Sequence, residues 1–134
     1  MIQAIFEGDV GVVANGPQCK HTPQRDKGRS LTQMPDFFVD VEDNARLHVA
    51  ALIHPGVVGE RIFAYAQPYT WRGVQRAIHR LYPNRAFSGD IEDAGLDASH
   101  IVPAPRAEAL LKDMGRPGWT DLKESVKMNV DDLA

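Results

Sequence analysis

The sequence predicts a chain of the α/β class with two short strands and about four helices, and an α+β arrangement is the alternative. Residues 37–52 run from an apolar strand directly into a helical pattern, with almost no loop between them. Residues 61–66 form a second apolar run, and another helical pattern follows it. Two strands do not make a self-sufficient sheet, so we expect the chain to rely on neighbouring structure that it does not supply.

Residues 1–36 are predicted to be irregular and loop-rich, whereas residues 37–134 are predicted to be structured. Residues 1–7 form a window too short to separate a helix from a strand. Glycine, proline and polar residues dominate the stretch that follows, and residues 20–29 are locally basic. We interpret this stretch as a solvated surface loop. Contact of the basic run with an acidic substrate or a 2′-phosphate is the alternative.

The first strand is predicted at residues 37–41 and the helix after it at residues 42–53. Asp40 is suited to cap this helix, because its short carboxylate accepts hydrogen bonds from the first free amides. Apolar residues are spread around the helix, so we expect burial on more than one face. The side expected to be buried carries Ala45, His48, Val49 and Leu52.

The second strand is predicted at residues 61–66, with Pro68 closing it. Apart from Tyr65 this strand is apolar on both faces, which is typical of a parallel strand covered by helices. Thr70 is then suited to cap a helix that Pro83 ends. The predicted buried stripe of that helix is Val74, Ala77, Ile78 and Leu81.

Two more helical patterns follow a loop at residues 83–103. The first pattern ends at the strong stop of Gly115 and Pro117, and the second is predicted to start with Thr120 as its cap. The apolar stripes are Ala107, Leu110, Leu111 and Met114 in the first helix, and Leu122, Val126, Val130 and Leu133 in the second.

The bulk composition excludes several classes of partner. The formal net charge is −3 and the isoelectric point is near 5.9, so we expect neither nucleic acid nor an anionic membrane surface as a partner. No apolar run approaches the ~20 residues of a membrane-crossing helix. Cys19 is the single cysteine, which excludes an intramolecular disulfide and favours a cytoplasmic location.

Three blocks within about residues 35–134 resemble the C-terminal part of extended short-chain dehydrogenases/reductases, in the NAD-dependent epimerase/dehydratase group. Residues 38–52 are similar to F-V-D-V-x-D-x-A-x-L-H-V-A-A-L. Residues 59–64 are similar to the strand G-x-R-I-F-A, and the P-x-x-W helix start follows at residues 68–71. Residues 106–125 are similar to A-x-x-L-L-x-x-x-G … G-W-x-x-L-x-E-S. The order and spacing of the blocks resemble fungal-type dihydroflavonol, cinnamoyl-CoA and aldehyde reductases.

This resemblance implies that two parts of a protein have different roles. In that family an N-terminal Rossmann domain binds NAD(P)(H), and a Tyr-x-x-x-Lys pair with a nearby Ser protonates the carbonyl oxygen. The C-terminal part covers the small-molecule carbonyl substrate. The resemblance therefore implies that this chain is the mostly helical, substrate-side portion of a Rossmann-type reductase. A missing Rossmann domain would be its partner, with residues 61–66 joining the sheet of that domain.

The family's chemical groups are absent from the sequence. The residues four positions after Tyr65, Tyr69 and Tyr82 are tyrosine, glycine and alanine, so no Tyr-x-x-x-Lys exists. Residues 8–14 match G-x-x-G-x-x-A, but the glycine–proline pair at 16–17 would interrupt the helix that has to meet a pyrophosphate. We interpret this motif as a surface turn. We assign no catalytic, cofactor-binding or metal-binding residue to the chain.

Arg85 and Phe87 are the substrate-binding candidates, because the matching loop faces the cleft in the family that the chain resembles. His48 is interpreted as a structural histidine, with a ligand or catalytic acid as the alternative. One cysteine and scattered histidines give no zinc-site spacing, and Cys19 is interpreted as a loop thiol. The aromatic core candidates are Phe37, Phe38, Phe63, Trp71, Phe87 and Trp119.

The function predicted from these observations is the substrate-binding C-terminal portion of an NAD(P)-dependent oxidoreductase acting on carbonyl or CH–OH groups. We expect this portion to be inactive alone and to bind no cofactor by itself, so whether the chain is an enzyme stays open. A non-catalytic binding or regulatory module derived from the same fold is the alternative. A hydrolase is disfavoured, because no G-x-S-x-G elbow is present.

Overall fold

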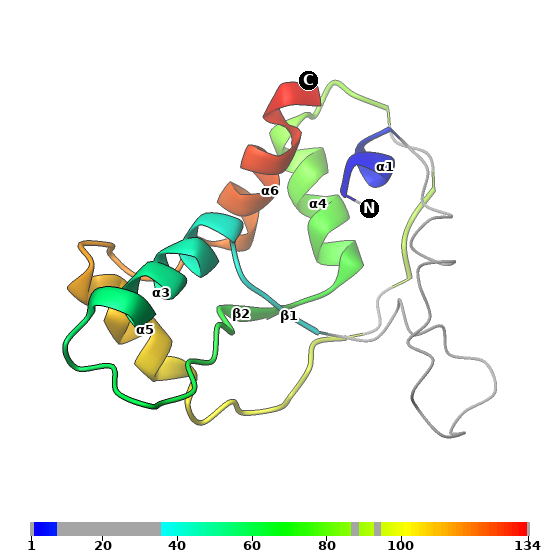
Figure 1. Ribbon diagram of the computed structural model, residues 1–134. Coiled ribbons are helices and arrows are strands. Elements are labelled where there is room, and N and C mark those ends of the chain that lie inside the picture. Colours follow the sequence, from blue (N-terminus) through cyan, green and yellow to red (C-terminus); the bar gives the residue numbers. More distant parts are fainter. Residues whose placement is uncertain (1, 8–35, 87–88, 93–94, 134) are drawn as a thin grey trace.

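The computed structural model describes residues 2–7, 36–86, 89–92 and 95–133 (Figure 1). Its elements are α1 (Ile2–Phe6), β1 (Asp36–Phe38), α3 (Val41–Ile53), β2 (Gln67–Tyr69), α4 (Trp71–Leu81), α5 (Ala104–Asp113), α6 (Leu122–Val130) and the short 3₁₀ helix η2 (Asp131–Leu133). The mixed α/β composition is confirmed, with two strands and four main helices between residues 36 and 130. The short N-terminal window is a helix.

The two strands pair antiparallel, with Phe37 opposite Pro68 and Phe38 opposite Gln67. The strand predicted at residues 61–66 is wrong in position, because a strand needs a hydrogen-bonding ladder and β1 pairs with residues 67–69 instead. Residues 61–66 approach β1 only at their end, where the amide of Ala66 donates to the carbonyl of Phe38 at 3.0 Å. Pro68 lies inside β2 rather than closing the strand, which an edge position tolerates.

Helix α3 begins as predicted, with the Oδ1 atom of Asp40 accepting a hydrogen bond from the amide of Glu42 at 2.9 Å. Its buried face differs from the predicted one and consists of Asp43, Leu47 and Ala50. The side predicted to be buried is exposed, and Leu52 keeps 85% of its surface accessible. The prediction of burial on several faces is also wrong within the described chain, because these three buried residues recur every three or four positions and therefore lie on one side of α3.

Helix α5 packs on α3 and ends as predicted. Gly115 adopts the left-handed conformation (φ +84°) that glycine tolerates, and the amide of Arg116 returns to the carbonyl of Leu111 at 2.9 Å. We call the resulting core the α3–α5 cluster. It contains Leu47, Ala50, Ala107, Leu110 and Leu111, with Ile62, Ala64 and Trp119 packed against it.

Helices α1, α4 and α6 form the second core, the α4–α6 cluster, and Figure 1 shows the two helix groups as separate. Thr70 caps α4 as predicted, since its Oγ1 atom accepts from the amide of Gly73 at 3.0 Å. The cap of α6 is Asp121 and not Thr120, and Leu133 remains 36% exposed. The cluster contains Ile5, Phe6, Val74, Ala77, Ile78, Ile91, Val126 and Val130.

Two buried carboxylates, which we call the aspartate pair, tie the helix groups together. The Oδ2 atom of Asp40 accepts from the hydroxyl of Ser125 at 2.8 Å, and the Oδ2 atom of Asp43 accepts from the amide of Thr120 at 2.7 Å. The guanidinium nitrogens of Arg46 and Arg116 lie 3.6 and 3.8 Å from the Oδ1 atom of Asp43. Both aspartates are almost fully buried, so the two hydrogen bonds replace part of the water that the carboxylates lose, while Oδ1 of Asp43 is held by charge alone and has no hydrogen-bond partner among the described residues.

A second polar clamp holds the turn after α3 against α5. The Arg106 guanidinium donates from Nε and Nη2 to the Glu60 carboxylate at 2.7–3.1 Å, and from Nη2 to the carbonyl of Gly56 at 2.9 Å. The hydrogen bond from Arg106 lowers the pKa of Glu60 from its ordinary value of 4.5. Ionised Glu60 therefore stabilises the fold.

Replacing Asp43 by Ala is expected to lower the free energy of unfolding by about 2–3 kcal/mol, because it leaves the amide of Thr120 without its buried acceptor and removes the carboxylate beside the guanidinium groups of Arg46 and Arg116. Urea unfolding measures the change. The matched control is Glu42→Ala, which removes an exposed carboxylate on the same helix and is expected to cost less than about 1 kcal/mol. Equal losses in the two variants would contradict the role of the aspartate pair.

Replacing Glu60 by Gln is expected to lower the urea midpoint at neutral pH. The lowered pKa of Glu60 means that its contribution is present above 4.5 and is lost as the pH falls through the folded-state value. The difference between wild type and Glu60→Gln should therefore shrink at a pH well below 4.5. Glu92→Gln, at an exposed loop position, is the control and should show little difference at either pH. A Glu60→Gln difference independent of pH would refute the assignment.

Candidate functional site

The candidate site is a cavity of about 340 Å³, which we call the aromatic groove. It lies between β1 and β2, the segment before β2, the loop before α5 and the start of α5. Its principal lining residues are Phe37, Tyr65, Pro68, His100, Pro105 and Trp119. An apolar concave surface with a few polar groups is the usual form of a small-molecule site.

Ring contacts position the walls of the groove. Phe37 and Tyr65 meet edge to face with 5.5 Å between ring centroids, and Tyr65 lies 6.2 Å from Phe63. The guanidinium of Arg61 covers the Phe63 ring, with 5.2 Å between them. Tyr65 is 39% exposed, so its ring is held from one side while part of its surface remains accessible.

The polar lining groups are Ser99, His100 and Glu108. The amide of Ser99 donates to Oδ1 of Asp97 at 2.7 Å, and hydrogen bonding by Ser99 lowers the pKa of Asp97. Glu108 pairs with Lys112 at 2.8 Å. These groups can orient a polar atom of a ligand. The lining includes no lysine that could tune Tyr65 as a proton donor.

A groove of about 380 Å³ between α4 and α6 has a different character. Arg76, Arg80 and Lys123 line it together with Asp121. Its charge makes it less suited to an apolar ligand than the aromatic groove.

Arg85, one of the two predicted substrate-binding residues, lies outside the aromatic groove. Its guanidinium stacks on the ring of Phe6 at 3.8 Å, and it lines a separate cavity of about 470 Å³ after α4. The neighbouring Tyr82 donates to Oδ1 of Asp131 at 2.9 Å; burial, followed by this hydrogen bond, raises the pKa of Tyr82. The substrate role of Arg85 stays a prediction, and Phe87 lies outside the described residues.

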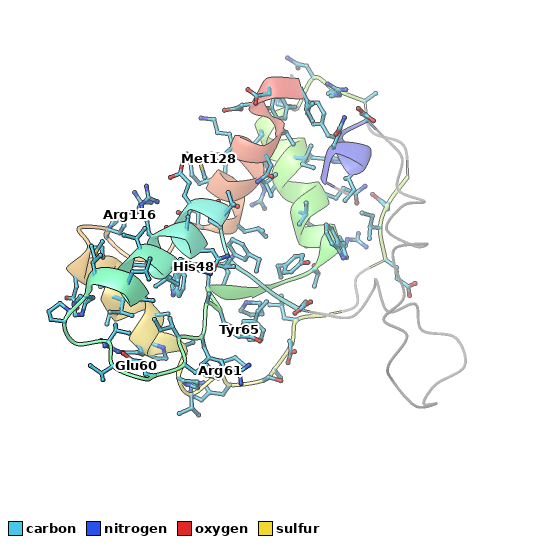
Figure 2. All side chains as sticks on the ribbon, in the orientation of Figure 1. His48, Glu60, Arg61, Tyr65, Arg116 and Met128 are labelled. Carbon is cyan, nitrogen blue, oxygen red and sulfur yellow. The ribbon has the colours of Figure 1, made fainter. Side chains whose placement is uncertain are left out.

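Several other sequence candidates are placed by the structure. His48 is exposed on α3 and its Nδ1 atom lies 2.8 Å from the carbonyl oxygen of Asn44 (Figure 2). The glycine motif at 8–14, Cys19 and the basic run at 20–29 lie outside the described residues. The aromatic side chains expected in the core are half-buried: Phe37, Phe38, Phe63, Trp71 and Trp119.

The described strand-to-helix turns do not fit a dinucleotide. A pyrophosphate needs free amides and glycine at such a turn. The turn from β1 to α3 instead carries the carboxylate of Asp40, which already occupies the amide of Glu42, and Thr70 occupies the amide of Gly73 at the start of α4. In the described ranges, no three His, Cys, Asp or Glu side chains gather to hold a metal ion. None of the described helices combines the length and hydropathy needed to cross a membrane.

Comparison with known proteins finds relatives with reductase names. Ketoreductase nvfG from Aspergillus novofumigatus is 42% identical over 94 residues, which are 69% of this chain and 28% of the relative. Aldehyde reductase 2 from Sporidiobolus salmonicolor is 36% identical over 93 residues, 69% of this chain and 27% of the relative. NAD-dependent epimerase/dehydratase tndE from Aspergillus flavipes is 35% identical over 97 residues, 68% of this chain and 26% of the relative.

The chain thus spans little more than a quarter of the length of the curated relatives that it matches. No model of a protein family matches the chain. The relatives confirm the resemblance that the three sequence blocks indicate, and the partial coverage is consistent with a C-terminal fragment.

Sequence reasoning missed the groove itself. Phe37, Tyr65, His100 and Trp119 are separated along the chain, and no spacing rule relates them. Two of them were predicted as core residues, which identified their apolar character but not the cavity beside them. The sequence signal that could have indicated the groove was the number of aromatic residues that flank proline-containing loops.

The contact between Arg85 and Phe6 predicts a structural effect of Arg85→Ala. Loss of the stacked guanidinium should lower the free energy of unfolding by about 0.5–1 kcal/mol, because α1 loses a cation–π contact. Arg80→Ala, on an exposed position of α4, is the control and should be nearly neutral. Chemical denaturation compares the two variants. No difference between them would show that the stacking is energetically unimportant.

Proposed function

We propose, from the homology of this chain to the C-terminal part of extended short-chain dehydrogenase/reductase-like reductases, that it is the substrate-binding portion of an NAD(P)-dependent oxidoreductase. The reaction class is reduction of a carbonyl group or oxidation of the corresponding CH–OH group. The observation that carries the proposal is the aromatic groove, which lies in a chain whose relatives bear ketoreductase and aldehyde reductase names.

The groove suits the substrate side of such a reaction. Tyr65 and Trp119 offer apolar surface to the carbon skeleton of a small ketone or aldehyde, and they exclude water from it. Ser99 and His100 are available to orient the polar end of the ligand. The described residues therefore select and position a substrate.

The dinucleotide and the proton donor belong to another part of the protein in this proposal. The turns that lead into α3 and α4 are already capped by Asp40 and Thr70, and the sequence contains no Tyr-x-x-x-Lys. A Rossmann domain is thus the partner that completes the site, and the chain alone is inactive. A lone cysteine supports the reducing cytoplasm as the compartment.

A non-catalytic binding or regulatory module is the second candidate. It is favoured by the two hydrophobic clusters and the aspartate pair, which give the described chain a core of its own. One sharp thermal transition of the isolated chain would favour this module, whereas broad melting with binding of a hydrophobic dye would favour a portion that needs its partner.

The purified chain is expected not to oxidise NADPH in the presence of aldehydes or ketones. Activity should appear in a chimera, in which residues 36–134 replace the matching portion of the Aspergillus ketoreductase. The loss of NADPH absorbance measures both reactions. Turnover by the purified chain, or an inactive chimera, would contradict the proposal.

Within the chimera, Tyr65→Ala is expected to raise the KM for an aromatic ketone by roughly tenfold, because the ligand loses apolar contact on one wall of the groove. Leu96→Ala removes an exposed apolar side chain from the loop after α4 that is not part of the lining, and it should leave KM unchanged. Steady-state kinetics of the two variants decide whether the groove contacts the substrate.

A further inference from the structure

The groove between α4 and α6 carries an excess of positive charge, and we call it the cationic groove. The two helices that form it lie side by side (Figure 1). Arg76, Arg80 and Lys123 line it, and Asp121 is the single acid among the described lining residues, so the net charge of the lining is +2. The whole chain has a formal net charge of −3, so this concentration of cations is a local property of the surface.

The sequences of the two helices place these cations together. Arg76 and Arg80 are four positions apart, so their side chains adjoin on one face of α4, and no Asp or Glu of α4 neutralises them. Lys123 lies in the first turn of α6 and lines the same groove. The helix dipole opposes a cation in the first turn, so the stability of α6 does not account for Lys123.

The three cations have no counterion within the described residues. Arg106, Lys112 and Arg116 each have a carboxylate within ion-pair distance, whereas no described carboxylate lies that close to the lining cations. Asp121 is engaged elsewhere, since its Oδ1 atom accepts from the amide of Glu124 at 2.8 Å as the cap of α6. The lining cations are exposed and repel one another, so an anion that entered the groove would relieve this repulsion.

We propose that the cationic groove binds a small organic phosphate. A phosphate monoester carries a charge of about −2 at neutral pH and three acceptor oxygens, which complements the net charge and the donors of the lining. Arginine binds such a group through two parallel N–H···O bonds. Ala77 and Leu122 offer apolar surface to the organic part, and a cavity of about 380 Å³ has the size of a small-molecule site.

This site is separate from the aromatic groove. Gln67 lines the cationic groove, whereas Pro68, the next residue of β2, lines the aromatic groove. Successive side chains of a strand point to opposite faces, so β2 lies between the two cavities. The organic phosphate is therefore a second ligand and not the carbonyl substrate, and its binding does not rest on the proposed function.

The test titrates phenyl phosphate into the isotopically labelled full chain, in a low-salt buffer without other phosphate, and follows the amide signals by NMR. The amides of Gly73, Ala77 and Leu122 should shift together, with a Kd on the order of 1 mM, while the amide of Leu110 in the α3–α5 cluster should not move. Inorganic phosphate should bind more weakly, because it has no part that contacts the apolar floor. Benzoate should bind roughly tenfold more weakly, because it carries one negative charge.

Variants of the lining locate the binding. Arg76→Gln and Arg80→Gln should each weaken the binding of phenyl phosphate by roughly tenfold, because each removes charged donors. Their melting temperatures should match that of the wild type, because both side chains are exposed. Lys127→Gln removes the same charge from an exposed position of α6 outside the lining, and this matched control should bind like the wild type.

Phosphorus NMR line broadening of phenyl phosphate gives the same comparison of variants in the chimera, so the measurement does not depend on the isolated chain folding alone. Equal binding by Arg76→Gln, Arg80→Gln and Lys127→Gln would overturn the site, and equal affinity for benzoate would overturn the phosphate class. Tighter binding of a polyglutamate peptide would assign the groove to an acidic protein and overturn the small ligand. An inactive chimera that binds phenyl phosphate contradicts the proposed function and supports the cationic groove.

Discussion

The buried aspartate pair is the constraint on which the arrangement of the chain depends. A carboxylate without water needs donors, and Asp40 and Asp43 obtain them from the hydroxyl of Ser125 and the amide of Thr120. These partners are about eighty positions away in the sequence. The start of α3 is thereby fixed to the start of α6. The α3–α5 cluster and the α4–α6 cluster are joined through these polar contacts and not only through apolar packing.

This constraint also determines which face of α3 meets the rest of the chain. Once Asp43 points toward Thr120, Leu47 and Ala50 on the same side pack on α5. The richer apolar side, with Val49 and Leu52, is turned away. A helix with apolar residues on two sides can bury only one of these sides inside this chain. The orientation that buries the carboxylate of Asp43 therefore leaves the other apolar side exposed.

The aromatic groove lies next to the α3–α5 cluster, and Trp119 contacts both. The starts of α3 and α4, the two described helices that follow a strand, are closed by the side chains of Asp40 and Thr70. The part of the chain that the structure describes thus holds a shaped apolar surface, in a chain that matches little more than a quarter of its reductase relatives.

The sequence by itself determined the four main helices, the caps of two of them and the family resemblance, because these depend on neighbours within a few positions. Asp40, Thr70 and Gly115 act as predicted, since a cap or a glycine stop needs only the adjacent turn. The tertiary structure alone decided the strand pairing, the exposed side of α3 and the groove. The apolar pattern at residues 61–66 was consistent with a strand, but pairing depends on which backbone lies alongside, and β1 selected residues 67–69. The groove likewise exists only where segments distant in the sequence meet, so no local pattern could specify it.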